Sequence, residues 1–453
     1  MILYILYIVF IKGGNKKMDF IEKQFQLKKH GTDIKTEFLA GLTTFATMAY
    51  VLAAVPAMMS SAEVFDNASV LTMVILLCAI TSIVMGIVTN RPFVLGPGLG
   101  SVGVYAVTMI GIEKISPDVA SGVIFWEGII FVLISFIGLR DLIVKIIPQS
   151  IKISISAGIG LFIALLGFKN AGIIVANAKK NVLMFGDLTS STAILAVIGF
   201  IILLILEIRK IKGGVILAII ITTIIGIPMG ITKIPESFFR MPGSPANMIL
   251  NIDVMGALDP KFIPFLFALF IPDFFSTFGT VIGVGAKAGL LDKDGNLPEI
   301  EKCFYVDSLS TVFGSLFCIP CMTTYLESAS GVEAGGKTGL TAVFTSIVFL
   351  LVFLITPLAL MIPSAATAPA LILIGVKMLS GMRNVNYEDQ TEAIPAFLSV
   401  ALTIFTFNVA NGIAAAIIVY VILKVTSGRK REIPKAMYPF ALLLCYYFYT
   451  LTI

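Results

Sequence analysis

Long runs of apolar residues follow one another along this chain, with only short polar connections between them. A membrane-spanning helix needs about 20 predominantly apolar residues, because each residue adds about 1.5 Å along the helix axis. The runs that approach this length are 38–58, 67–88, 121–138, 150–168, 190–208, 213–230, 261–285, 303–320, 340–362, 365–381, 392–408 and 409–426. This pattern predicts an all-α protein whose helices cross a membrane many times.

Two further segments, 93–110 and 323–338, are rich in glycine and interrupted. With these, we expect about fourteen membrane segments, whereas 437–453 could be either a short span or an interfacial helix. Composition agrees, since 58% of residues are hydrophobic, 13% are charged and the mean hydropathy is +1.00. Soluble domains carry about 25% charged residues, so a soluble fold could not cover its surface with this composition.

The charged residues are concentrated between the apolar runs. The net charge of +5 comes from basic connections such as Lys28–Lys29, Arg209–Lys210 and Arg429–Arg431, which is typical of cytoplasmic loops and not of nucleic-acid binding. We therefore expect a cell-membrane protein whose N-terminal segment, 1–37, is cytoplasmic. Residues 1–11 are too short to span and lack the features of a signal peptide, and we expect Met18 to be the true start.

The two halves of the chain share a layout. Adding 230 to a residue number takes Thr43, in a polar membrane segment, onto Asp273, and takes Pro97, in a broken segment, onto Glu327. Seven segments per half is an odd number, so the second copy enters from the opposite side of the membrane. We predict an inverted repeat, whose interrupted helices mark a substrate site near the membrane midplane.

The repeat sets the expected domain organisation. The first copy spans 38–230 and the second spans 261–428, joined by an extracellular connection over 231–260. A basic loop and a short apolar segment, 429–453, follow the second copy.

Two acidic residues stand at membrane depth in the second copy. Asp273 lies inside an apolar run, where a carboxylate costs at least about 2.5–3.5 kcal/mol and must face a cavity, find a partner or be protonated. Glu327 lies in a stretch of small polar residues and glycine that can expose its backbone only to a polar cavity. Each has a structural alternative: Asp273 near a helix end, and Glu327 as a cap of a half-helix that begins near Ser328.

Two carboxylates beside broken-helix backbone suit a neutral, planar ligand rich in N–H donors and suit an anion poorly. Desolvation and a like-charged neighbour favour protonation of a carboxyl group. We therefore expect Asp273 and Glu327 to bind the substrate, and we expect a proton bound at Asp273 or Glu327 to travel with it.

Three other patterns are interpreted structurally. Gly331–Thr338 fits a phosphate-binding loop but lacks the α/β domain that such a loop needs, so we expect a tight turn with Lys337 near water. Cys318 and Cys321 are expected to be small core residues and not zinc ligands, since a zinc site takes four ligands. Glu127, beside Trp126, is expected to be an interfacial residue and not a member of a relay. No nucleophile–base pair appears, which disfavours an enzyme, and no cofactor is expected.

The chain resembles a known family. Asp273-Phe-Phe-Ser-Thr-Phe-Gly-Thr, the stretch that begins Thr323-Thr-Tyr-Leu-Glu-Ser-Ala-Ser-Gly, and Ala40-Gly-Leu-Thr-Thr-Phe-Ala-Thr-Met-Ala-Tyr are similar to the AzgA-like permeases for hypoxanthine, guanine and adenine. This is a branch of the nucleobase–cation symporters related to uracil and xanthine permeases. The likeness runs from about Met18 to Gly428.

The resemblance implies a purine-base symporter with seven-plus-seven inverted repeats. It implies a core domain of segments 1–4 and 8–11, a gate domain of segments 5–7 and 12–14, and two short antiparallel strands near Gly96 and Thr324. It further implies that the backbone near Tyr325 and Gly98 closes the site. We place Thr44 and Thr277 in the same substrate site. Dimers through the gate domain are common in the family, so a homodimer is an option.

Two positions depart from the family pattern. Ser276 stands where the family usually has a second Asp, and Val102 stands where it usually has Asn. Hydrogen-bonding capacity near the site is therefore reduced, and the particular base and the coupling ion stay open. The alternatives are a permease for xanthine, uracil or another heterocycle and, on the same inverted-repeat plan, an anion transporter.

Overall fold

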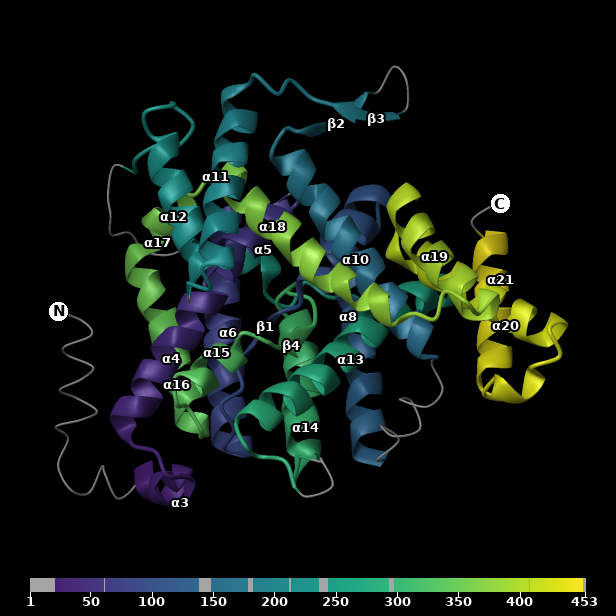
Figure 1. The fold of residues 1–453 in the computed structure, drawn as a ribbon, viewed down its shortest axis with the longest axis horizontal. Helices are drawn as coiled ribbons and strands as arrows, with labels where there is room; N and C mark the ends of the chain where they lie inside the picture. The colour runs from purple at the N-terminus through teal and green to yellow at the C-terminus, as the bar shows by residue number, and fades with distance from the viewer. Residues whose placement is uncertain are drawn as a thin grey trace.

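The protein is built almost wholly from helices, as the computed structural model shows in Figure 1. It describes residues 21–450 apart from 61, 138–147, 178–181, 212, 236–242, 293–296 and 407. The expectations for the chain start at Met1 or Met18 lie outside the described residues.

The elements of the first half follow the predicted order. They are α3 (Leu27–His30), α4 (Ile34–Met48), α5 (Val51–Ser60), α6 (Asn67–Thr89), β1 (Leu95–Pro97), α7 (Leu99–Val102), the π-helix η1 (Gly103–Ile112), α8 (Pro117–Ile137), α10 (Gln149–Asn170), β2 (Ile174–Asn177), β3 (Val182–Phe185), α11 (Ser191–Ile208) and α12 (Gly214–Gly226). The hairpin of β2 and β3 was not expected, because it lies in a connection between apolar runs.

The second half begins after short 3-10 turns, which include η3 (Gly256–Leu258). Its elements are α13 (Ile263–Lys287), α14 (Ile300–Ser315), β4 (Met322–Thr324), α15 (Ser328–Glu333), α16 (Gly339–Leu351), η5 (Val352–Ile355), α17 (Thr356–Leu360), α18 (Ser364–Leu379), η6 (Ser380–Asn384), α19 (Gln390–Phe405), α20 (Val409–Thr426) and α21 (Met437–Thr450). Asn408 lies between α19 and α20, and its amide donates to Glu113 Oε1 at 2.8 Å.

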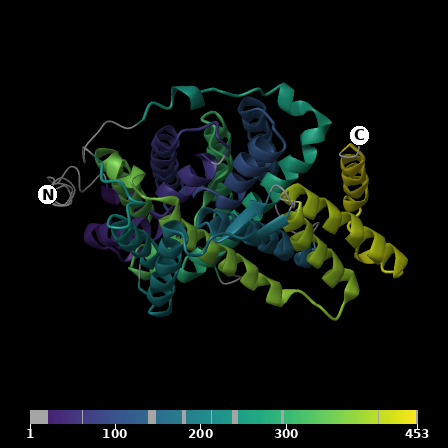
Figure 2. The same ribbon diagram turned by 90° about the horizontal axis from the view of Figure 1, so that it is seen from above.

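Eight of the described helices are long and apolar enough to cross a membrane, which confirms a multi-pass membrane protein. Several other predicted segments form shorter apolar helices, among them α12, α19 and the helical part of 99–112, so helix length does not fix the count at fourteen. The helix α21 has 14 residues and packs on α20, and its Phe440 ring lies 4.0 Å from that of Phe267 in α13. Figure 2 shows α20 and α21, in yellow, at one side of the molecule.

The two broken segments meet in the interior. The strands β1 and β4 pair antiparallel, with Leu95 opposite Thr324 and Pro97 opposite Met322, and every residue of both strands is buried. The pairing extends beyond the strands, because Tyr325 N donates to Val94 O and Gly98 N donates to Cys321 O, both at 2.9 Å. The prediction of two short antiparallel strands near Gly96 and Thr324 is confirmed. Backbone that leaves the helical state at this depth finds its hydrogen bonds in the other broken segment.

Helix packing places the two halves against one another. In one group α6 and α4 pack on α16, while α14 and α13 pack on α8. In a second group α10 packs on α18 and α19, α11 packs on α12 and α18, and α19 packs on α20. The crossing of α6 and α16 depends on glycine, because a Cβ added at Gly339 would stand 1.8 Å from Gly86 O.

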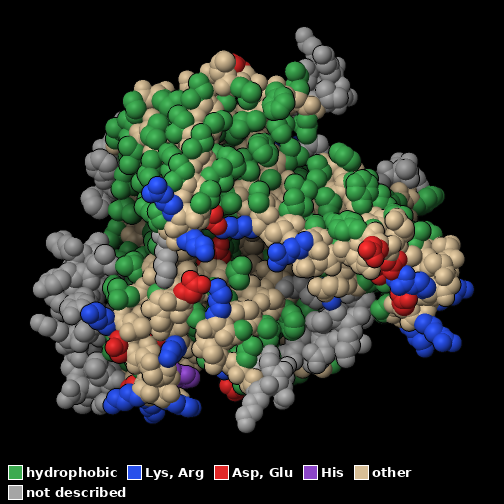
Figure 3. All heavy atoms as spheres, viewed as in Figure 1, with side chains coloured by type: hydrophobic (Ala, Val, Ile, Leu, Met, Phe, Trp, Pro, Cys, Tyr) green, Lys and Arg blue, Asp and Glu red, His purple; other side chains and the backbone are tan. Residues whose placement is uncertain are grey.

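Hydrophobic side chains cover the upper part of the face in Figure 3, and charged side chains gather in its lower part. Exposed large apolar residues are numerous on α11 and α12, including Ile201, Ile205, Ile208, Ile220 and Ile224. Such a surface would be unstable in water, but it suits a lipid environment, where apolar side chains can face hydrocarbon.

Candidate functional site

A cavity of about 730 Å³ lies where the broken segments face the second group of helices. One wall comes from the turn between α4 and α5, from α7 and α13, and from the segments around β1 and β4, and it includes Tyr50, Gly98, Asp273, Thr323, Tyr325 and Glu327. The other wall comes from α10, α18 and η6, and includes Gln149, Lys152, Ser156, Ile374, Met378 and Gly381. The lining among the described residues carries two acids, Asp273 and Glu327, and one base, Lys152.

Glu327 stands at the break after β4, directly before α15, as the sequence predicted. It occupies the N-cap position, but its side chain accepts no hydrogen bond from that helix, so the capping alternative is wrong. Its Oε1 instead accepts a hydrogen bond from the Tyr50 hydroxyl at 2.9 Å. The next helical turn is tied to α4, because Ser330 Oγ and Thr47 Oγ1 lie 2.7 Å apart. Glu327 is thus held at the cavity wall with one oxygen available to a ligand.

Asp273 lies midway along α13, one residue after Pro272, and is 2% exposed. A proline inside a helix removes one backbone hydrogen bond, which is consistent with a functional break at this level. Its Oδ2 accepts a hydrogen bond from Thr311 Oγ1 of α14 at 3.3 Å, and its Oδ1 is buried without a partner. Asp273 therefore lines the cavity on one side and faces the protein interior on the other.

Glu127 is placed differently from the prediction. It was expected at the membrane interface, but its exposed fraction is 0% and it lies behind the cavity wall. Its neighbour Trp126 is the more exposed of the two: it is only partly buried and donates its indole N–H to Val254 O at 2.9 Å. Successive residues on a helix point about 100° apart, so adjacent residues can occupy the two environments. The sequence interpretation followed Trp126 and was wrong for Glu127.

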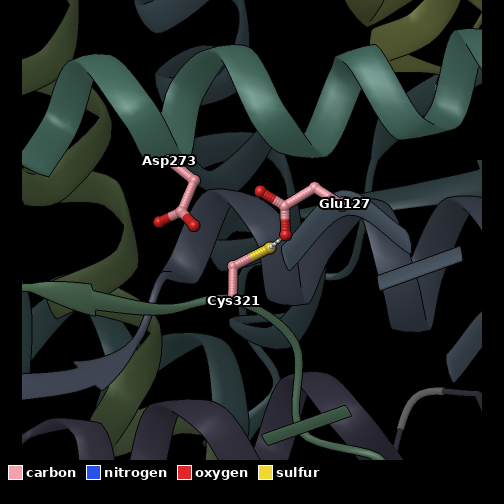
Figure 4. Close-up of side chains that lie close together, drawn as sticks. All are labelled: Glu127, Asp273 and Cys321. Carbon is pink, nitrogen blue, oxygen red and sulfur yellow. Dashed lines mark hydrogen bonds between the residues drawn. The ribbon is translucent and has the colours of Figure 1, made fainter. Parts of the chain in front are cut away.

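Glu127, Asp273 and Cys321 come together, with one ligand-type atom of each within 4.8 Å of the others. Figure 4 shows one oxygen of Glu127 on the side that faces Asp273 and the thiol of Cys321 directed at Glu127, to whose Oε2 it donates at 3.5 Å. One thiol and two carboxylates fall short of the four ligands of a structural zinc site, and we interpret the group as two acids with a thiol donor. Cys318, in contrast, is a buried small residue whose thiol donates to Asn251 O at 3.6 Å.

A further acid, Asp307 of α14, is buried behind Thr277. Its Oδ2 accepts from Thr277 Oγ1 at 2.9 Å, and its Oδ1 accepts from Thr324 Oγ1 at 2.8 Å. These bonds tie α13 and β4 to α14. They also account for Thr277, which was expected in the substrate site but stands one layer behind the cavity lining.

The other predicted site residues divide into two sets. Tyr325 and Gly98 line the cavity, and the Tyr325 hydroxyl donates to Pro97 O at 2.5 Å, which joins the two broken segments. Thr44 lies away from the lining and donates to Ala40 O at 3.1 Å within its own helix. Ser276 lines the cavity, whereas Val102 is buried and does not.

The stretch that resembles a phosphate-binding loop, Gly331–Thr338, binds a carboxylate of the protein, that of Glu37. The buried carboxylate of Glu37 accepts from Lys337 N at 2.9 Å and from the backbone and hydroxyl of Thr341 at 3.1 and 2.5 Å. The turn and the start of α16 therefore dock on α4 through a buried carboxylate, and Lys337 is partly exposed as expected.

Sequence reasoning missed Tyr50, Glu127, Asp307 and the role of Cys321. Tyr50 stands where α4 gives way to α5, a break that the unbroken apolar run 38–58 concealed. Glu127 and Asp307 were single acids in apolar stretches, a signal that was available but was applied only to Asp273 and Glu327.

A family model described as a permease family matches residues 35–425 of this chain. The chain is 39% identical over 413 residues to the adenine permease AdeQ of Escherichia coli, with 91% of this chain and 92% of the relative covered. It is 33% identical over 427 residues to the guanine/hypoxanthine permease PbuO of Bacillus subtilis, with 92% of this chain and 98% of the relative covered.

The fold is shared with a solved structure of low sequence identity, the transmembrane domain of a cyanobacterial bicarbonate transporter, BicA. The TM-score is 0.62 at 16% identity, and the alignment covers 84% of this chain and 97% of that domain. At this identity the likeness concerns the fold alone.

Proposed function

Because this chain belongs to the permease family and is a transporter and not an enzyme, we propose that it carries purine nucleobases across the cell membrane through the cavity between its two helix groups. The observation that carries the proposal is the presence of Asp273 and Glu327 on one cavity wall, between the broken segments. The names of relatives such as AdeQ and PbuO, which cover almost the whole chain, support purines as the substrate class.

The chemistry of the cavity suits a neutral heterocycle. A purine base presents N–H donors along its edge, and carboxylate oxygens and strand backbone can accept from them. Hydrogen bonds to a charged acceptor contribute about 1.5–3 kcal/mol each, which is enough for selective binding by two acids. Among the described lining residues an anion would meet two carboxylates and one base, Lys152, so the anion-transporter alternative is disfavoured although BicA shares the fold.

Alternating access follows from the arrangement of the two groups. We assign segments 1–4 and 8–11 to a core domain that carries Asp273 and Glu327, and segments 5–7 and 12–14 to a gate domain that carries the opposite wall. The inverted repeat is supported by matching packing pairs, since α6 on α16 corresponds to α14 on α8, and α11 on α12 corresponds to α19 on α20. A sliding of one domain past the other would open the cavity to either side in turn.

Orientation is proposed from the basic residues. Lys28, Arg91 and Lys337 lie at the same end of the molecule, because Lys337 Nζ approaches Gly31 O and Asn90 contacts both Phe25 and Gly339. Basic connections favour the cytoplasmic side. We infer that this end and the N-terminus are cytoplasmic, and that an inward proton gradient drives uptake.

The test is uptake of radiolabelled adenine, guanine and hypoxanthine by cells that express the wild type, Glu327→Gln or the control Glu333→Gln. Glu333 lies at the end of the same short helix and is exposed, paired with Lys287. We expect saturable uptake by the wild type and the control, and a KM raised by about 10–150-fold in Glu327→Gln, from the loss of one charged hydrogen bond. Undiminished uptake by Glu327→Gln would remove the site assignment, and an absence of competition by every purine would remove the substrate class.

A further inference from the structure

Glu127 and Asp273 form a pair of acids for which the described part of the protein supplies no counter-charge. Every ion pair of the described residues joins other side chains, and none includes Glu127, Asp273 or Asp307. Both acids are buried, at 0% and 2% exposure. Two buried carboxylates this close cannot both be ionised at low cost, so the pair needs a cation.

A second observation points to the same place. Glu127 Oε1 and Asp273 Oδ1 are both buried and have no hydrogen-bond partner among the described residues. Buried polar atoms are nearly always paired, and each exception requires an explanation. In Figure 4 one oxygen of Glu127 lies on the side that faces Asp273. A proton between them would give each unpartnered oxygen a hydrogen bond and would remove the charge repulsion.

Among the described residues, the elements that pack most on α8 bring no basic side chain to Glu127. The helices packed on α8 bring Asp273 from α13 and Asp307 from α14, and Cys321 approaches from the segment before β4. The remaining neighbours, η1 and η3, bring Tyr105 and the adjoining Asp253, which contact α8 nearer its start, at Ser121 and at Asp118. In the described part of the chain, the groups that these elements bring to Glu127 are therefore neutral or acidic.

We propose that Glu127 is the proton-carrying group of this transporter and that it shares its proton with Asp273. This inference rests on the proposed function and moves the coupling proton away from Glu327. With Glu127 protonated, its O–H donates to one oxygen of Asp273, and Asp273 stays ionised and accepts an N–H of the base from the cavity side. Without that proton both carboxylates are ionised and repel one another, and Asp273 lacks the O–H donor that holds it in place for the base.

The transport step then balances simply. One proton enters the Glu127–Asp273 pair and one neutral base enters the cavity, and both leave on the opposite side with no covalent change. Asp273 is the link, because it lines the cavity whereas Glu127 and Cys321 lie behind it. Proton and base each raise the affinity for the other, as reciprocal coupling requires.

The experiment uses purified full-length protein in proteoliposomes. Radiolabelled adenine accumulation is measured with an inward proton gradient, and adenine exchange is measured at equal pH. Glu127→Gln supplies a permanent neutral donor, so we expect exchange near the wild-type rate and a complete loss of gradient-driven accumulation. The control Glu113→Gln alters an exposed acid at the end of η1 and should accumulate adenine like the wild type.

Binding provides a second measurement. When adenine is added to the wild-type protein in weakly buffered detergent, the protein should take up protons from the medium. The Glu127→Gln protein should take up none. If Glu127→Gln fails to exchange adenine, Glu127→Asp replaces it, and a retained response of Glu127→Asp to the gradient supports the proposal.

The results that would overturn the inference differ from the result that would refute the proposed function. Wild-type accumulation by Glu127→Gln, loss of the gradient response in an exchanging Glu127→Asp, or accumulation driven by sodium without a proton gradient would overturn the inference. Loss of uptake on chelation of metals would assign the Glu127–Asp273–Cys321 group to a metal instead and would also overturn it. A wild type that exchanges no purine base would refute the proposed function itself.

Discussion

Replacement of Glu37 by alanine would remove a buried carboxylate that docks the turn before α16 onto α4. Its carboxylate accepts from the N–H of Lys337 and from the N–H and O–H of Thr341, within 2.9, 3.1 and 2.5 Å. The side chain is fully buried, so three donors would lose their partner in a place with little access to water: Lys337 N–H, Thr341 O–H and Thr338 N–H, which donates to Glu37 at 3.4 Å. Thr341 N–H keeps a second acceptor, Thr338 O, at 3.2 Å.

The magnitude follows from the number of donors. A buried donor left unpaired costs about 1–3 kcal/mol, and three donors at about 1–2 kcal/mol each give a loss of about 3–6 kcal/mol. The variant Glu37→Gln keeps one carbonyl oxygen as an acceptor and should lose roughly half as much. An exposed acid makes the matched control: Glu333, whose surface pair with Lys287 is worth about 0–1 kcal/mol.

The assay is thermal unfolding of the detergent-purified protein, followed by the monodisperse fraction that remains after heating. We expect the order of apparent melting temperature to be wild type and Glu333→Ala together, then Glu37→Gln, then Glu37→Ala several degrees lower. The reasoning is refuted if Glu37→Ala melts within a degree or so of Glu333→Ala, because the loop N–H groups would then be satisfied without the carboxylate.

Two further predictions follow from single contacts. Gly339→Ala would place a methyl group 1.8 Å from Gly86 O, so we expect α6 and α16 to separate and the yield of folded protein to fall well below that of the wild type, measured by size-exclusion chromatography of a fluorescent fusion. Tyr50→Phe removes the hydroxyl that donates to Glu327 at 2.9 Å. Loss of this hydrogen bond, which contributes about 1.5–3 kcal/mol to holding the Glu327 carboxylate in place, should raise KM for the base with a smaller change in maximal rate. Equal KM values for the variant and the wild type would contradict the placement of Glu327.

Much of the architecture could be read from the order of residues alone. Apolar runs locate membrane helices because hydrocarbon excludes charges over a fixed thickness, a constraint that is local in sequence. The interruptions at Gly96 and Thr324 were readable for the same reason, since glycine and small polar residues at that depth require a polar cavity. The motifs around Asp273 and Glu327 then carried the resemblance to permeases, which the match over residues 35–425 confirms.

Contacts between distant segments could not be predicted from the sequence. Glu127 and Cys321 are 194 positions apart, and Tyr50 and Glu327 are 277 apart, so no local pattern pairs them. Which side of a helix faces the interior is decided by its neighbours, and Trp126 and Glu127 illustrate this, because one lies toward the surface and the other is buried among acids. The sequence by itself determined that acids lie at membrane depth; only the tertiary structure decided that Asp273 joins the cavity to a second acid behind it, because charge coupling depends on distance in space and not along the chain.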